Sequence, residues 1–223
     1  MTSALRADGF DSLLAGRTSG LVRDDGRPLP LEAARWRAAA GPDDAWLLDR
    51  CTGPTLDLGC GPGRLVAALA ARGVPALGVD SSGVARALCR RRGAAMVHRD
   101  LFGPLPGERT WAHVLLADGN IGIGGDPVRL LARVATLLAV GGTALVEAGP
   151  EPHELWSGSV RATGRGQRGT EGAVDGRSGE AVPWACVGAV ALCALARAAG
   201  LTPTACARTV SGRTFVELIL IAG

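Results

Sequence analysis

The chain has 223 residues and a formal net charge of +3, which fits one α/β domain and gives no electrostatic sign of a nucleic-acid partner. It contains 24 arginines but neither lysine nor tyrosine, so a Schiff-base lysine, a P-loop lysine and a phenolic acid or base are excluded. The candidates for a general base are therefore the carboxylates, the six cysteines and three histidines, His98, His113 and His153.

Residues 1–50 lack the regular alternation of strand-like and helix-like stretches that begins at residue 51. Turn-forming residues stand at 24–26, and a helical stretch lies near residues 31–40. We expect this segment to be a helical lid outside the main domain, which spans residues 51–223.

From residue 51 onward, short apolar runs alternate with stretches of helix-forming residues. Strands are predicted at residues 55–58, 76–79, 95–98, 112–117 and 143–146. Helices are predicted at residues 65–71, from Ser81 or Ser82 to residue 92, and from residue 127 to about 140. The last helix has the clearest signals, because Asp126 can cap it and Pro127 suits its first position. Its apolar residues recur on one face, as expected of a helix packed on a core.

The final third of the chain breaks this alternation once. Residues 149–183 are rich in glycine and arginine, and we expect them to form an inserted loop or hairpin on the substrate side. A helix follows at 187–199, and then two strands at 202–209 and 213–221. Only three residues separate these strands, so they must pair antiparallel.

These elements predict an α/β fold with a doubly wound, Rossmann-like sheet. The sheet has seven strands that are mostly parallel, and its last strand is antiparallel. In such a sheet, ligands bind in the crevice beyond the carboxyl ends of the strands. Residues that directly follow the predicted strands are therefore the candidates for a binding site.

Three glycines at alternate positions follow the first of these strands, within residues 56–64 (LDLGCGPGR). Glycine permits a positive φ and a close approach of a ligand to the backbone. A dinucleotide-binding loop requires G-x-G-x-x-G, and neither register of Gly59, Gly61 and Gly63 completes it. Pro62 also lacks an N–H for a phosphate, so a ligand without phosphate is favoured.

The same stretch resembles motif I of the class I S-adenosylmethionine (SAM)-dependent methyltransferases, in the form seen in small actinobacterial members. Other segments of the chain resemble further motifs of that family. They are Asp80 after the second strand, residues 98–101 after the third, residues 114–120, and residues 138–146. The resemblance covers about residues 54–148. It implies SAM as the cofactor, S-adenosylhomocysteine as the product, and a Rossmann-like fold.

The resemblance also implies a role for individual residues. Asp80 would accept hydrogen bonds from the ribose hydroxyls, and Asp100 would accept one from the adenine amino group. Asp57 would order the glycine loop or reach the ammonium group of SAM. The residues expected to bind the cofactor are Asp57, Gly59, Gly61, Gly63, Asp80, Ser81, Asp100, Leu101 and Ala117.

The candidates for catalysis lie after the fourth and fifth strands. They are Asp118, Asn120 and His153, with His153 as the leading general base. Gly122, Gly124 and Gly125 would let this loop approach a ligand closely.

The sequence also suggests locations for several other residues. Trp156 and Trp184 are candidates for pocket walls or for anchors of the insertion. Arg64 and the run 90–92 are expected to be solvated helix residues. The six cysteines lack metal-ligand spacing, and no third ligand joins Asp118 and Glu147, so no metal is expected.

The function expected from these features is methyl transfer from SAM to a small molecule, with the acceptor atom left open. The Asn-Pro-Pro-aromatic signature of nucleic-acid amino methyltransferases is absent, and no apolar run is long enough to span a membrane. The first residues do not resemble a signal peptide, and the composition is typical of GC-rich bacteria, so we expect a bacterial cytoplasmic protein. An NAD(P)-dependent oxidoreductase and a non-catalytic SAM-binding protein are the alternatives. The oligomeric state is not indicated.

Overall fold

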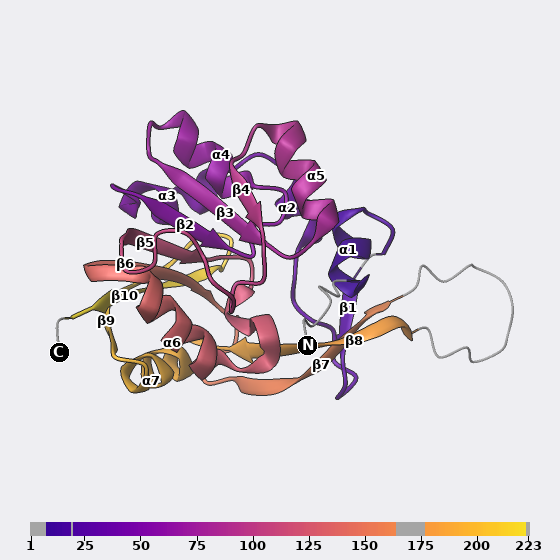
Figure 1. Cartoon of the computed structure of the whole chain (residues 1–223). Coiled ribbons are helices and arrows are strands. Elements are labelled where there is room, and N and C mark those ends of the chain that lie inside the picture. The colour runs from indigo at the N-terminus through magenta and orange to yellow at the C-terminus, as the bar shows by residue number, and fades with distance from the viewer. Residues whose placement is uncertain (1–7, 19, 164–176, 222–223) are drawn as a thin grey trace, which may run out of the picture.

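A seven-stranded sheet forms the centre of the computed structural model, which describes residues 8–18, 20–163 and 177–221 (Figure 1). The strand order is β4-β3-β2-β5-β6-β10-β9. These strands are β4 (Met96–His98), β3 (Ala76–Asp80), β2 (Thr55–Leu58), β5 (Trp111–Leu116), β6 (Leu138–Ala148), β10 (Thr214–Leu220) and β9 (Leu201–Arg208). Strand β10 is antiparallel to both β6 and β9, whereas β4, β3, β2, β5 and β6 are parallel. The predicted sheet and its antiparallel last strand are confirmed.

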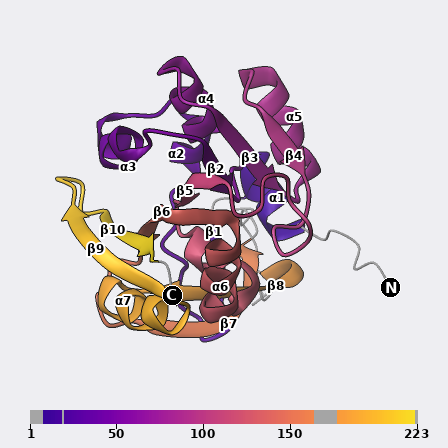
Figure 2. The same cartoon turned by 60° about the vertical axis from the view of Figure 1, so that its left-hand side comes forward.

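Helices cover both faces of this sheet. Helices α3 (Ala45–Arg50), α4 (Arg64–Ala71) and α5 (Gly83–Arg92) lie on one side, and α6 (Pro127–Leu137) and α7 (Ala189–Ala198) lie on the other (Figures 1 and 2). The predicted caps form, because Ser82 accepts a hydrogen bond from the Ala85 N–H and Asp126 accepts one from the Arg129 N–H. Helix α6 ends at Leu137, earlier than predicted, since the chain continues directly into β6.

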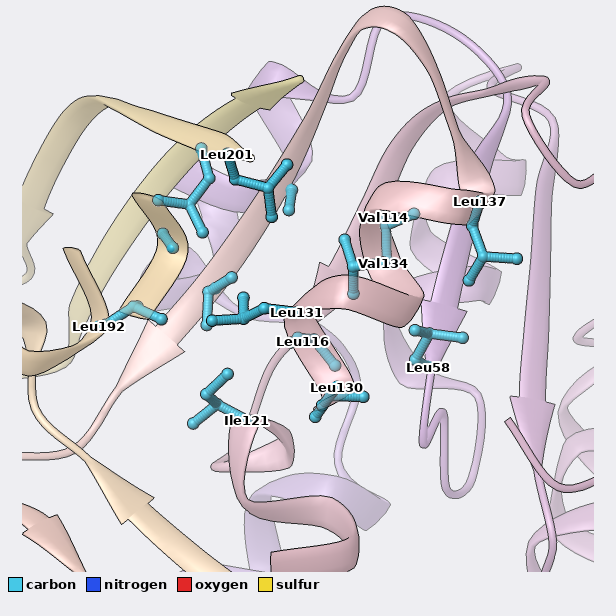
Figure 3. Packing of buried hydrophobic residues seen from close by; sticks show 14 of the residues in the cluster. Leu58, Val114, Leu116, Ile121, Leu130, Leu131, Val134, Leu137, Leu192 and Leu201 are labelled. Carbon is cyan, nitrogen blue, oxygen red and sulfur yellow. The ribbon is translucent and has the colours of Figure 1, made fainter. Parts of the chain in front are cut away.

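The largest hydrophobic core lies between the sheet and α6 and α7. Figure 3 shows Leu58, Val114 and Leu116 from the strands against the buried face of α6. The residues that define that face are fully buried, as their spacing predicted: Leu130, Leu131, Val134 and Leu137. Leu138, which was predicted on the same face, begins β6 and is 1% exposed.

A second, three-stranded sheet joins the N-terminal segment to the segment before α7. Its order is β1-β7-β8, formed by β1 (Gly20–Arg23), β7 (Leu155–Thr163) and β8 (Arg177–Val187). Residues 164–176 of the expected insertion lie outside the described residues. The rest of the N-terminal segment contains α1 (Asp8–Leu14), α2 (Ala33–Arg37) and the 3₁₀ helix η1 (Pro42–Asp44). Because β1 pairs with β7, the two segments pack as one unit rather than as separate appendages.

The glycine-rich loop after β5 forms the 3₁₀ helix η2 (Asn120–Gly125) and packs against β8. A Cβ at Gly122 would lie 2.1 Å from the Ala185 carbonyl oxygen and 2.5 Å from Trp184 Nε1. A Cβ at Gly125 would lie 3.2 Å from the Trp184 backbone nitrogen. The expectation that the glycines of this loop admit a ligand is therefore corrected for Gly122 and Gly125, since they admit a strand of the chain itself. Gly124 instead contacts Phe102 and lines a cavity.

No helix in the described part of the chain is long and apolar enough to cross a lipid bilayer.

We predict that Gly122→Ala destabilises the protein by about 1–3 kcal/mol, because the new methyl group must push η2 away from β8. Urea unfolding would measure this loss. The control is Gly83→Ala at the start of α5, where a Cβ meets open space and alanine favours the helix. Equal losses in the two variants would contradict the packing argument.

Candidate functional site

The glycine loop between β2 and α4 has the backbone that its sequence predicts. The backbone φ angles are 74° at Gly59, 50° at Gly61 and 75° at Gly63. Residues other than glycine rarely adopt these positive values. Space is also short at Gly59, where a Cβ would lie 2.7 Å from the Ile123 side chain and 2.8 Å from Asn120 Nδ2. Gly59 and Gly61 line a cavity of about 180 Å³.

Four carboxylates line the same cavity, and three of them lie in or after the neighbouring strands β2, β3 and β4. They are Asp57 in β2, Asp80 at the end of β3, and Asp100 after β4. Asp80 accepts hydrogen bonds from the N–H groups of Gly61 (2.9 Å) and Ser82 (2.8 Å), and Asp100 accepts one from Phe102 (3.0 Å). Ser81 and Leu101 also line the cavity.

Asp57 differs from the other two carboxylates. It is 3% exposed, and no donor among the described residues forms a hydrogen bond to its carboxylate. Burial raises the pKa of Asp57 to about 7; Arg64 opposes the rise, and the nearby Asp118 and Asp80 add to it. The cavity therefore holds a carboxylate that lacks a cationic donor in contact with it.

Gly63 and Ala117 do not line this cavity. A Cβ at Gly63 would lie 2.6 Å from the Ala94 Cβ and 2.9 Å from the Cys89 sulfur, so this glycine permits close packing of α4 on its neighbours. Ala117 directly follows β5 and is buried, with 2% of its surface exposed.

The remaining wall of the cavity comes from segments far away in the sequence. Phe10 and Leu14 of α1, Trp36 of α2 and Trp184 of β8 line it, and Figure 1 shows α1 between α5 and the β7–β8 hairpin. The ring centroids of Phe10 and Trp184 are 4.6 Å apart. The sequence pattern indicated Trp184 but not Phe10, Leu14 or Trp36, because a buried apolar residue in a short helix has the same pattern in any core. Trp156 lines neither cavity and packs 3.9 Å from the Arg23 guanidinium.

Arg92 ties this wall to the glycine loop. Its guanidinium donates to the carbonyl oxygens of Pro62 (3.1 Å), Arg37 (2.6 Å) and Ala38 (3.0 Å). The expectation of a solvated run at 90–92 is therefore wrong for Arg92, which bridges α5 to the end of α2.

A second cavity, of about 220 Å³, adjoins the first. Trp36, Asp118 and Trp184 line both cavities. The polar part of its lining comprises Glu32, Arg35, Asp118, Glu147, Ser211 and Arg213. The candidate Asp118 thus lies where the two cavities meet.

A cluster of three arginines and three carboxylates lies beneath this junction. We call it the arginine–carboxylate cluster, and it consists of Arg35, Asp44, Arg64, Asp118, Glu147 and Arg213. Its three positive and three negative formal charges balance, which lowers the free-energy cost of burying charged side chains.

Arg213 makes the most contacts in this cluster. Its Nε and Nη2 lie 2.8 and 2.7 Å from the two oxygens of Glu147, and its Nη1 lies 2.8 Å from Asp44. This planar, two-point pairing with a carboxylate is the geometry that a guanidinium favours. The loop before β10 is therefore fixed to β6 and to the N-terminal segment.

Arg64 is buried in the cluster instead of being solvated, which corrects the sequence-based expectation. It forms ion pairs with Asp44 and, at 2.6 Å, with Asp118. Burial acts to raise the pKa of Asp44, but hydrogen bonds from Arg64 and Arg213 hold that pKa below its ordinary value. Burial raises the pKa of Asp118, and Arg64 opposes the rise.

The other two catalytic candidates lie apart from this cluster. Asn120 lines the first cavity, and its Nδ2 donates to the carbonyl oxygens of Leu58 and Gly59, each at 2.9 Å. It thereby braces the glycine loop. His153 is exposed in the turn before β7 and lines neither cavity, so the structure does not bring it together with Asp118 and Asn120. No group of three or more His, Cys, Asp or Glu residues in the described ranges is arranged to hold a metal.

We predict that Arg213→Ala lowers the free energy of unfolding by about 3–5 kcal/mol, because it leaves Glu147 and Asp44 buried with too little positive charge. Urea unfolding at neutral pH would measure the change. The control is Arg72→Ala, which removes an exposed pair with Asp49 and should cost less than about 1 kcal/mol. Equal costs would show that the cluster does not hold these segments together.

We predict that Asp57→Asn stabilises the ligand-free protein in a pH-dependent way. Between about pH 4 and 7 the unfolded Asp57 ionises while the folded one keeps its proton, so the wild-type protein loses stability as pH rises, by up to about 4 kcal/mol. Asparagine cannot ionise, so the gain should grow over that range and stay constant above it. Urea unfolding at pH 5 and pH 8 would test this, and equal gains at both would assign the effect to packing.

Comparisons with known proteins give a fold but no close relative. No family model and no curated protein matches the chain. Among solved structures, a SAM-dependent methyltransferase from Bacteroides fragilis, in complex with S-adenosylhomocysteine, is 16% identical with a TM-score of 0.75. That match covers 100% of this chain and 98% of the other.

Two further structures have a named acceptor class. The 1,6-didemethyltoxoflavin N1-methyltransferase of Burkholderia thailandensis is 19% identical, with a TM-score of 0.65 over 100% of this chain and 92% of the other. The amino pentose methyltransferase CalS10 of Micromonospora echinaspora is 19% identical, with a TM-score of 0.58 over 84% and 94%. The strand order, the glycine loop and these matches agree: the chain has the fold of the class I SAM-dependent methyltransferases.

Proposed function

We propose that the chain transfers a methyl group from SAM to a small-molecule acceptor. The observation that carries this proposal is the set of three carboxylates, Asp57, Asp80 and Asp100, around one cavity bounded by the glycine loop. SAM has three donor groups at well-separated positions: an ammonium, a ribose diol and an adenine amino group. The three strand ends supply one acceptor for each.

The residues present fit this cofactor. Asp57 would pair with the ammonium, which supplies the positive charge that the buried carboxylate lacks and favours its ionised form. Each oxygen of Asp80 accepts one backbone N–H, and so retains lone pairs for the ribose hydroxyls. Asp100, with Leu101 and Ser81 beside it, would receive the adenine. In this proposal Gly63 and Ala117 do not contact the cofactor. Gly63 permits close packing behind the glycine loop, and Ala117 is buried after the end of β5.

SAM supplies a methyl group bound to a sulfonium sulfur. This sulfur departs as a neutral thioether, so the leaving group is already activated. The chain's own contribution is then to align the two reactants and to keep water out. Alignment of this kind is worth roughly 7–11 kcal/mol in well-oriented reactions. Phe10, Trp36 and Trp184 line the cavity as its apolar wall, and Asp118 lies at the point where an acceptor in the second cavity would approach the methyl group.

The small-molecule acceptor is supported by the size of the second cavity, which is about 220 Å³ and is lined partly by the N-terminal segment and β8. Two of the structural relatives are named as methyltransferases of 1,6-didemethyltoxoflavin and of an amino pentose, both small molecules. The proposal includes a location in the bacterial cytoplasm, which is supported by six cysteines that are all unpaired in the described residues.

We predict that Asp80→Ala weakens the binding of S-adenosylhomocysteine by about tenfold or more, because charge-assisted hydrogen bonds to the ribose are lost. Isothermal titration calorimetry would measure both proteins. The control is Asp49→Ala, which removes an exposed carboxylate that lines neither cavity.

The same titration tests the oxidoreductase alternative. Binding of NADH without binding of S-adenosylhomocysteine would overturn the proposed function in favour of an oxidoreductase. Binding of S-adenosylhomocysteine with an unchanged affinity in Asp80→Ala would refute the ribose assignment.

A further inference from the structure

We propose that the second cavity binds a planar acceptor in its anionic form, such as a phenolate, an enolate or a deprotonated nitrogen heterocycle, and that Arg35 receives the anion. This inference rests on the proposed function, since it concerns the acceptor side of the same site. It goes beyond that function by naming the chemical class of the acceptor and the residue that selects it.

The walls of the cavity favour a flat ligand. Trp36 and Trp184 stand where the two cavities meet, and Phe10 contacts both, with its ring 22° from parallel to that of Trp36. Aromatic faces stack well on planar ligands. Elsewhere the lining is largely apolar, with Leu29, Leu31, Pro30, Ile121, Pro150 and Val187.

The buried carboxylates of this cavity are already occupied. Both oxygens of Glu147 accept from Arg213, and the oxygens of Asp118 lie 2.6 Å from Arg64 and 3.4 Å from Arg213. An ammonium substrate would therefore compete with guanidinium groups for both carboxylates. A neutral alcohol or amine would also find neither of them free to take its proton.

Two arginines of the arginine–carboxylate cluster line the second cavity, Arg35 and Arg213. Arg213 donates to Glu147 and Asp44, so Arg35 is the one of these two with unused donors. Its nearest carboxylate oxygens, on Glu32, Asp118 and Glu147, lie at 3.4, 3.7 and 3.7 Å, and no side-chain hydrogen bond from Arg35 forms within the described residues. Its Nε is buried without an acceptor, which is costly for a polar group. An oxyanion or a nitrogen anion in the cavity would satisfy these donors by charge-assisted hydrogen bonds.

An acceptor that binds as an anion already carries the electron pair that forms the new bond. Its proton leaves to solvent when it binds, and the guanidinium lowers the pKa of the bound acceptor. No residue of the chain then has to act as a general base. This agrees with the position of His153 outside both cavities.

The test uses three probes of similar size in the presence of saturating S-adenosylhomocysteine: 4-nitrophenol, neutral 4-nitroanisole and cationic benzylamine. Calorimetry measures their affinities, and the visible absorbance of nitrophenolate measures the pKa of the bound phenol. We expect nitrophenolate to bind at least about tenfold more tightly than the other two, as one charge-assisted hydrogen bond allows. We also expect the pKa of bound nitrophenol to be lower than that of the free phenol.

Three variants assign the effect to Arg35. Arg35→Gln should lose the preference for nitrophenolate and return the pKa of bound nitrophenol to its free value. Glu32→Gln removes an exposed carboxylate that competes for Arg35 at 3.4 Å, so it should strengthen nitrophenolate binding. Arg91→Gln removes the same charge from an exposed arginine outside both cavities and should change nothing.

The outcomes separate the two proposals. If the wild-type protein does not bind S-adenosylhomocysteine, the proposed function itself fails. If it binds S-adenosylhomocysteine but prefers benzylamine or nitroanisole, only the anionic acceptor is overturned. An Arg35→Gln variant that retains both S-adenosylhomocysteine binding and the phenolate preference would also overturn the role of Arg35, as would weaker nitrophenolate binding in Glu32→Gln.

Discussion

The arginine–carboxylate cluster is the interaction on which the site depends, because it ties the N-terminal segment and α4 to the paired strands β6 and β10. Asp44 comes from the N-terminal segment, Arg64 begins α4, Glu147 lies in β6, and Arg213 precedes β10. Removing one member leaves its partners buried without compensation, whereas the complete set is neutral. The strand ends, α4 and the N-terminal segment are therefore held in one arrangement.

The cluster also determines which charges remain available for ligands. Asp118 and Glu147 are occupied by arginines, although they lie where a catalytic base would be expected. Among the described residues, the carboxylate of Asp57 accepts no hydrogen bond and the guanidinium of Arg35 donates none, and these two groups line different cavities. Each has the charge opposite to that of the ligand group proposed for it. A site of this kind gives up some stability of the empty protein for affinity toward its ligands.

Much of the fold was predictable because it depends on local signals. The caps at Ser82 and Asp126, the buried face of α6 and the short β9–β10 connection each follow from a few neighbouring residues. The positions of Gly59, Gly61, Asp80 and Asp100 at one cavity follow as well, since parallel strands end at the same edge of a sheet. The same reasoning failed where a residue's partner is distant. Arg64 has the pattern of a solvated helix residue, yet it contacts Asp118, 54 positions away.

The sequence by itself determined the sheet, its antiparallel last strand and the acidic residues around the glycine loop, because strand periodicity and glycine conformation are properties of short segments. Only the tertiary structure decided what fills the space beyond the strand ends. It placed Trp36 and Trp184 between the two cavities, used Gly122 and Gly125 to admit β8, and paired Asp118 with Arg64. Those contacts join residues far apart in the chain, and the packing of whole segments is what brings them together.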